Sequence, residues 1–248
     1  MIWPLHICSR SLGAAAALAL LALLPASVLW AATVAGAVEL RESRIDSVAR
    51  GKDYSGVVIS LHAVNQPAAS NAARHVTMLQ KDKMFTPHIL PILAGTTIDF
   101  PNADPIFHNA FSSYSGQIFD VGLYPPGTSR SVRFQRPGIV RVFCNIHPAM
   151  SAIILVLATP HFTVTAREGS FHLDVPAGSY DLRVFHERAT EQTLDSLSRR
   201  IIVGTDGLRV PPISVSEAGY LITPHKNKYG KDYDPPPDDK TLYPGGHP

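Results

Sequence analysis

Short runs in which apolar and polar residues alternate, separated by glycine and proline, constrain the fold of this chain most. In GVVISLHAV, residues 56–64, apolar side chains fall on one face while Ser60 and His62 fall on the other, as a half-buried strand requires. Similar runs, such as HILPILAGTTIDFPN and GIVRVFC, are bounded by turn signals, and this spacing is typical of sandwiches and barrels. Residues 188–200 fit either one short helix or an exposed loop. We therefore predict an all-β chain.

The N-terminus has the layout of a secretory signal peptide. Arg10 precedes the apolar run SLGAAAALALLALLPA, and small residues follow, the order typical of such signals. We predict a signal peptide over residues 1–31, with cleavage between residues 31 and 37. The protein would then be periplasmic, with no membrane span after cleavage. The alternative is an uncleaved anchor, which Pro25 disfavours because it shortens the apolar core below the ~20 residues of a spanning helix.

Cysteine usage and charge narrow the possible functions. Cys8 precedes the apolar run and leaves with the signal, so Cys144 is the only cysteine of the mature chain. The full chain has a formal net charge of +2, and this near-neutrality argues against a nucleic-acid partner. The mature length of about 215 residues suits one large or two small domains.

The stretch FCNIHPAM, residues 143–150, contains the residues most suited to chemistry. Alternation in GIVRVFC puts Cys144 on the face of the two valines of that run. His147 and Met150 follow at intervals of three, so the three side chains converge only if the chain leaves the strand and curls. Pro148 favours a curl because it fixes φ and removes a donor. We predict a strand, a tight loop with three donor atoms, and the buried strand SAIILVL.

Thiolate, imidazole and thioether donors together favour copper. Two histidines, one cysteine and a weak axial methionine form the blue-copper electron-transfer pattern. The best candidate for the second histidine is His108, which follows the strand TTIDF. Asn109 has a side chain able to hydrogen-bond across to the ligand loop. Zinc fits less well, because methionine is a poor zinc ligand, and a Cys-His nucleophile would need an exposed thiolate.

These residues resemble the cupredoxins over residues 85–157. The Cys-x-x-His-x-x-Met spacing is similar to that of amicyanin and pseudoazurin rather than to the longer plastocyanin loop. The resemblance implies a Greek-key β-sandwich with one type 1 copper ion and His147 at the exposed edge where electrons pass. The ligands it implies are His108, Cys144, His147 and Met150, with Asn109 and Pro148 around them.

The remaining histidines do not suggest an enzyme. Multicopper oxidases and copper nitrite reductases need additional histidine-rich copper sites, and none of the 11 histidines forms a His-x-His pair. Phe143 and Asn145 flank the cysteine where those enzymes would place a histidine. We predict an electron-transfer protein without a substrate-turnover site.

A second module follows the copper loop. FTVTAREGSFHLDVPAGSYDLRVFHE predicts a β-meander with turns at Glu168-Gly169 and at PAG. It resembles the carboxypeptidase-regulatory or transthyretin-like sandwich, in which Asp-Gly is the commoner first turn. Two strands much like TVAGAVELR and SGVVISLHAV precede this segment in that family.

The order of these segments predicts an insertion. We expect the cupredoxin domain, residues 67–159, to interrupt a transthyretin-like sandwich built from residues 33–66 and 160–216. Pairing of residues 57–63 with the cupredoxin strands would contradict this. Residues 217–248 are rich in proline and charge and are predicted to form an extended, flexible tail.

These features together predict a periplasmic blue copper protein that carries single electrons between redox partners, such as a c-type cytochrome or a dehydrogenase. The alternative is a periplasmic copper-binding, storage or sensing protein, or a structural binding protein with an incidental metal site. Both modules with the HKNKYGKDY tail also resemble bacterial proteins described as methylamine-utilization or plastocyanin-like proteins.

Overall fold

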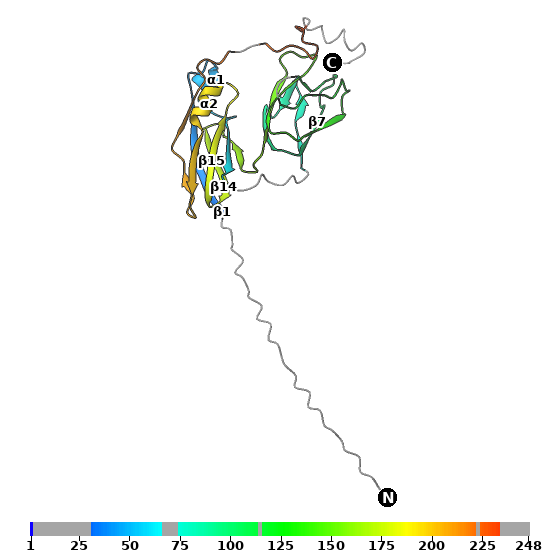
Figure 1. Ribbon diagram of the computed structural model, residues 1–248. Helices are drawn as coiled ribbons and strands as arrows, with labels where there is room; N and C mark the ends of the chain where they lie inside the picture. Colours follow the sequence, from blue (N-terminus) through cyan, green and yellow to red (C-terminus); the bar gives the residue numbers. More distant parts are fainter. Residues whose placement is uncertain (2–30, 66–73, 114–115, 222–223, 234–248) are drawn as a thin grey trace.

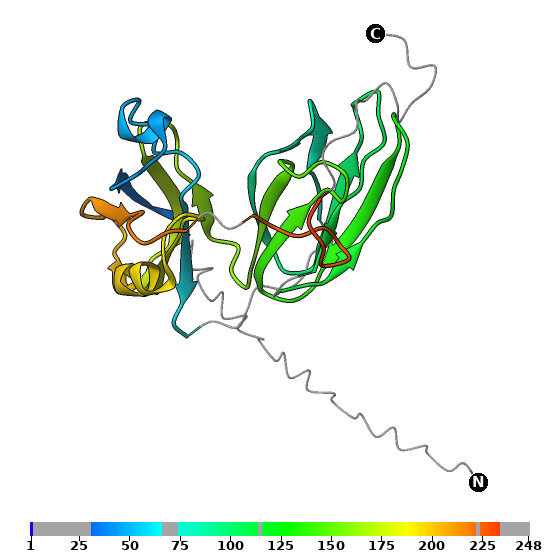
Figure 2. The same ribbon diagram turned by 90° about the horizontal axis from the view of Figure 1, so that it is seen from above.

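Two β-rich bodies make up the described part of the chain (Figures 1 and 2). We call residues 75–157 the inner module, and residues 31–63 together with 162–216 the outer module. Most of the predicted signal peptide and the end of the predicted tail lie outside the described residues. The computed structural model describes residue 1 and residues 31–65, 74–113, 116–221 and 224–233.

The outer module consists of two four-stranded sheets. In one, β1 pairs antiparallel with β14 and parallel with β17 and β18; in the other, β2 lies between β13 and β15, and β15 pairs with β16. The chain thus leaves this module after β2 and returns at β13. The strands are β1 (Ala31–Arg41), β2 (Val58–Ala63), β13 (Phe162–Val164), β14 (Ser170–Pro176), β15 (Gly178–Phe185), β16 (Arg199–Val203), β17 (Leu208–Arg209) and β18 (Ile213–Ser216).

The pairing of β2 follows the apolar alternation of the sequence. Leu61 is opposite Leu182 of β15, and both side chains are completely buried in the core between the two sheets. Val58 points the other way, yet it is also buried, because it packs against Leu155 and Leu157 of the inner module. The face of β2 that was expected to be the more polar one is therefore partly covered by the contact between the modules.

Two short helices complete the outer module. Residues 188–200, for which the sequence left helix or loop open, contain α2 (Glu191–Leu197), and the Thr190 side chain caps it by accepting a hydrogen bond from the Thr193 N–H. The helix α1 (Asp46–Ala49) was not predicted. No helix among the described residues is long and apolar enough to span a membrane.

Strand β1 begins inside the predicted cleavage zone. Ala32 and Val34 are buried in the core, and the pairing with β14 extends from Ala31 to Ala37. Cleavage directly after residue 31 would preserve almost all of this pairing, whereas cleavage after residue 37 would remove it. The pairing of β1 with β14 is therefore compatible only with a cleavage site near the early end of the predicted range.

The inner module consists of two larger sheets and the two-stranded sheet β4-β5, and a separate core lies between the larger two. One has the order β10-β7-β3 and the other the order β6-β12-β11-β8-β9; β3 runs parallel to β7, and β6 parallel to β12. This arrangement confirms the all-β sandwich prediction. The strands are β3 (His75–Thr77), β4 (Leu79–Lys81), β5 (Met84–Thr86), β6 (Ile89–Leu93), β7 (Thr96–Pro101), β8 (Phe111–Ser112), β9 (Phe119–Asp120), β10 (Ser129–Phe134), β11 (Gly138–Phe143) and β12 (Ser151–Leu157).

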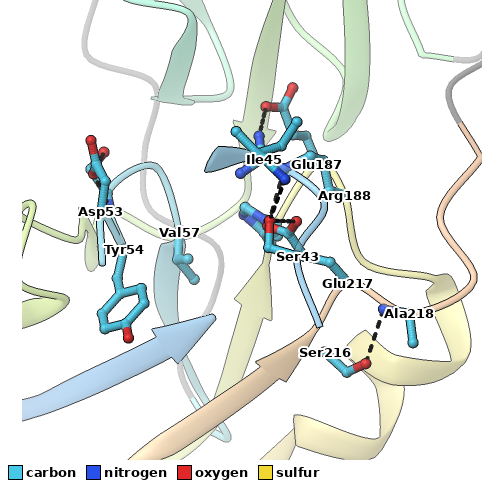
Figure 3. Close-up of polar contacts among 12 residues, drawn as sticks. Ser43, Ile45, Asp53, Tyr54, Val57, Glu187, Arg188, Ser216, Glu217 and Ala218 are labelled. Atoms are coloured by element: carbon cyan, nitrogen blue, oxygen red, sulfur yellow. Dashed lines mark hydrogen bonds and ion pairs between the residues drawn. The ribbon is translucent and has the colours of Figure 1, made fainter. Parts of the chain in front are cut away.

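A polar cluster lies where the outer module meets both the inner module and the start of the C-terminal tail (Figure 3). Glu217 accepts hydrogen bonds from Ser43 at 2.6 Å and from Arg188 at 3.0 Å, and its Oε1 lies 2.8 Å from the His186 ring. Burial opposes ionisation of Glu217, but these partners outweigh it and lower its pKa. Glu187 extends the cluster to His88 of the inner module, 2.7 Å away. The tail therefore begins at a fixed point on the outer module.

Candidate metal centre

The segment after β11 forms the tight loop that the sequence predicted. The Cys144 N–H donates to the Met150 carbonyl at 3.1 Å, and the Met150 N–H donates to the His147 carbonyl at 3.0 Å. Because Cys144 and Met150 are both buried, the curl turns their side chains into the core of the inner module. We call residues 143–150, where the sequence predicts three of the copper ligands, the copper loop.

The fold brings His108 to this loop from a segment 36 residues earlier. His108 and Tyr124 exchange two backbone hydrogen bonds, of 2.9 and 3.1 Å, which fix the histidine between β7 and β8. Its Nδ1 lies 4.0 Å from the Cys144 sulfur, and the His147 Nδ1 lies 3.5 Å from that sulfur. The three donor atoms all lie within 4.8 Å of one another, a spacing that one metal ion can bridge.

The three donors differ in their access to solvent. His108 and Cys144 are completely buried, whereas His147 is half-buried. The imidazole rings of His108 and His147 lie 4.9 Å apart, centroid to centroid. Of these three donors, His147 therefore gives the most direct route from solvent to the site.

Asp104 holds the far side of the His108 ring and was missed by the sequence analysis. Its Oδ2 lies 2.6 Å from His108 Nε2, which leaves Nδ1 to face the sulfur. The backbone N–H groups of Asp82 and Lys83 also donate to this carboxylate, at 2.6 and 2.9 Å. Burial opposes ionisation of Asp104, but the donors outweigh it and its pKa is lowered. An acceptor of this kind fixes the tautomer and orientation of a metal-binding imidazole.

The sulfur of Cys144 is surrounded by backbone donors. Burial raises the pKa of the thiol, while the N–H groups of Ile146, Asn109 and His147 act in the opposite direction. A metal ion binds cysteine as thiolate and displaces its proton. These N–H groups are therefore placed to stabilise a metal-bound sulfur.

The predicted role of the Asn109 side chain is wrong. Its Nδ2 donates to Asp120 Oδ1 at 2.8 Å and to the Gly122 carbonyl at 2.9 Å, not to the copper loop. The pairing of β8 with β9 brings Asp120 close to it. Asn109 instead acts on the copper loop through its backbone N–H, which lowers the pKa of the Cys144 thiol against the effect of burial.

Pro148, the other residue predicted to lie around the copper ligands, is exposed at the turn of the copper loop. Its carbonyl accepts a hydrogen bond from His225 Nε2 at 2.7 Å. Residues 224–233, which fall within the predicted tail, contain no helix or strand and lie against the copper loop. Composition gave no sign of these contacts, since the segment has no apolar periodicity.

Comparison with known proteins gave matches among solved structures alone. No protein-family model matches the chain, and no curated protein matches it. A Cu-containing nitrite reductase from Thermus scotoductus SA-01 is 29% identical, with a TM-score of 0.33, and the match covers 37% of this chain but only 25% of the enzyme. A purple cupredoxin from Nitrosopumilus maritimus is 21% identical over 34% of this chain and 99% of its own, with a TM-score of 0.31. Amicyanin from Paracoccus versutus is 19% identical over 40% of this chain and 98% of its own, with a TM-score of 0.32.

Proposed function

We propose that this chain binds one copper ion through His108, Cys144, His147 and Met150 and carries single electrons in the periplasm. The observation that carries the proposal is the convergence of two imidazole nitrogens on one buried thiol; Met150, at the end of the same loop, is also buried. Cysteine, two histidines and a distant methionine are the donor set of blue-copper electron-transfer sites. Copper held there would supply one-electron redox chemistry.

The protein residues would hold the ion with little rearrangement. Asp104 fixes the His108 ring, and two backbone hydrogen bonds close the copper loop. Electrons would enter and leave near His147, the half-buried ligand, and a redox partner such as a c-type cytochrome or a dehydrogenase would dock there. A preorganised site of this kind favours transfer because few groups have to move.

A carrier is favoured over an enzyme by the contacts of the residues that flank Cys144. The Phe143 ring stacks on His225 at 4.0 Å, and Asn145 Oδ1 accepts the Lys228 N–H at 3.0 Å. Phe143 thus takes part in ring stacking and Asn145 in a hydrogen bond, and neither position supplies a histidine to a second metal.

The outer module would orient the inner one. We propose that it is a transthyretin-like sandwich interrupted by the cupredoxin domain, as the pairing of β2 with β13 and β15 supports. The whole chain would then be a member of the methylamine-utilization-type periplasmic proteins.

Protein-film voltammetry on the copper-loaded mature chain tests the proposal. The expected result is one reversible one-electron wave that is lost in His147→Ala and retained in His75→Ala, which alters an exposed histidine in β3. A chain that binds only Cu(I) and gives no reversible wave would support storage or delivery instead.

A further inference from the structure

The C-terminal segment, residues 224–233, packs along the copper loop (Figure 2, red). The Tyr233 hydroxyl donates to the Cys144 carbonyl at 2.8 Å. His225 stacks on the Phe143 ring at 4.0 Å and 24°. It also bonds to the Pro148 carbonyl through Nε2, and its Nδ1 lies 3.2 Å from the Tyr233 hydroxyl. These two residues of the segment therefore support each other while they contact both ends of the turn.

Lys228 connects the segment to both parts of the chain that provide ligands. Its backbone N–H donates to Asn145 Oδ1 in the copper loop at 3.0 Å. Its Nζ donates to Asp120 Oδ2 at 2.8 Å, and Asp120 Oδ1 accepts from the side chain of Asn109, the neighbour of His108. A continuous chain of hydrogen bonds therefore runs from the copper loop through Lys228 to the His108 segment.

The segment has internal structure that directs Lys228. Asn227 Oδ1 accepts the backbone N–H groups of Tyr229 and Lys231 at 3.0 and 3.1 Å, and the Asn227 N–H donates to the Lys231 carbonyl at 2.9 Å. This turn is typical of asparagine. It places the Lys228 backbone toward the copper loop and its ammonium toward Asp120.

The same stretch of chain is attached to the outer module shortly before it reaches the copper loop. Glu217 is buried in the polar cluster with Ser43, His186 and Arg188. The copper loop is thus supported from outside by residues that follow the outer module in sequence. The inner module forms its core without them.

We infer that residues 224–233 are a brace that fixes the ligand geometry, with Tyr233 and Lys228 as positioning residues. The inference rests on the proposed copper site. Copper(I) and copper(II) prefer different coordination geometries, so the change of oxidation state pushes the ligand loop to move. A loop held by hydrogen bonds to Cys144, Asn145 and Pro148 resists that movement, and groups around the ligands tune the metal. The brace therefore keeps the reorganisation of the site small and its potential fixed.

A pair of conservative substitutions within the segment tests the brace. Tyr233→Phe removes the hydroxyl that bonds to Cys144 and keeps the ring. Tyr229→Phe is the matched control, because Tyr229 is 70% exposed and the substitution keeps the ring, whose centroid lies 5.3 Å from Lys228 Nζ. Both variants of the full mature chain are compared with the wild type, first without metal and then with Cu(II).

In the metal-free chain, Tyr233→Phe should accelerate hydrogen exchange of the amides of residues 144–150 by about fivefold, the effect of losing one ordinary hydrogen bond. In the copper-loaded chain it should shift the midpoint potential and slow electron self-exchange. Lys228→Met should produce the same changes, because it removes the link to Asp120. Tyr229→Phe should leave all three measurements at their wild-type values.

Two results separate failure of the brace from failure of the copper site. If the wild type binds copper and cycles reversibly, but Tyr233→Phe and Lys228→Met match Tyr229→Phe in exchange, potential and self-exchange, the brace is wrong. If Tyr233→Phe accelerates hydrogen exchange of the loop amides in the metal-free chain, but neither the wild type nor any variant binds copper, the proposed function is wrong. The conclusion that residues 224–233 hold the loop in place would then still stand.

Discussion

The carboxylate behind His108 gives a prediction whose size can be worked out from the structure. Asp104 accepts three hydrogen bonds, from the backbone N–H groups of Asp82 and Lys83 and from the ring of His108. The residue is only 7% exposed, so water cannot easily replace a lost acceptor. Asp104→Asn preserves the shape of the side chain but replaces one acceptor oxygen with an NH₂ group.

Either orientation of the new amide leaves a buried donor without an acceptor. With the NH₂ group in the place of Oδ2, both Lys83 N–H and His108 Nε2–H face a donor; in the other orientation, Asp82 N–H does. A buried donor left unsatisfied costs about 1–3 kcal/mol, and the loss of the charge weakens the bonds that remain. We expect the free energy of unfolding of the metal-free chain to fall by about 2–3 kcal/mol. Copper affinity should fall by about 10–100-fold, because the acceptor that orients a ligand histidine is lost.

The assay is denaturant unfolding of the metal-free chain followed by circular dichroism, together with a competition titration of Cu(II). Asp99→Asn is the matched control: Asp99 also accepts from a histidine, His75, and its side chain is 33% exposed. Asp99 also accepts from Ser131, but both of its partners lie at an exposed site where water can replace a lost bond, so the change should alter stability by less than about 1 kcal/mol. Equal effects of Asp104→Asn and Asp99→Asn on both measurements would refute the role assigned to Asp104.

Three further outcomes follow from the fold. The hydrogen bond to Glu187 raises the pKa of His88 above its usual 6.5. The bond therefore stabilises the folded protein below that pH, and the stabilisation disappears as the pH rises through the higher pKa of the folded state. The difference in Tm between wild type and His88→Gln should be largest near pH 5–6, and a difference that does not vary with pH would contradict this. Gly169→Ala should lower the free energy of unfolding by clearly more than about 1 kcal/mol, because the new Cβ would lie 2.0 Å from the Val38 carbonyl oxygen. Gly122→Ala is the control in the same denaturation assay, because Gly122 also has a positive φ but has open space around it, so its loss of stability reports the backbone strain alone. Mass spectrometry of the exported protein should find an N-terminus near residue 32, and a start at residue 38 would be incompatible with the pairing of β1 and β14.

The parts of the fold that the sequence predicted are those encoded locally. Alternation in β2 and β11 identifies which side chains face a core, and the buried Ile59, Leu61 and Cys144 follow from it. The copper loop was predictable because its donors lie within seven residues and Pro148 favours the curl. The burial of Val58 was not predictable, because side chains of the inner module cover it and its own sheet does not.

The parts that were missed depend on contacts between distant segments. Asp104 reaches His108 only because the turn between β4 and β5 presents two N–H groups to the same carboxylate. Tyr233 bonds to Cys144 across 89 residues, from a segment with no periodic pattern. The Asn109 side chain was assigned the wrong partner for the same reason, because Asp120 approaches it through the pairing of β8 and β9.

The central claim is that His108, Cys144, His147 and Met150 form one blue copper site. A titration of the metal-free mature chain with Cu(II), followed by visible absorption and electron paramagnetic resonance, tests it most directly. We predict an intense blue colour that saturates at one equivalent in the wild type and is absent in Cys144→Ser, since the colour requires a copper–thiolate bond. A chain that stays colourless at saturation, or a Cys144→Ser variant with the wild-type spectrum, would contradict the claim.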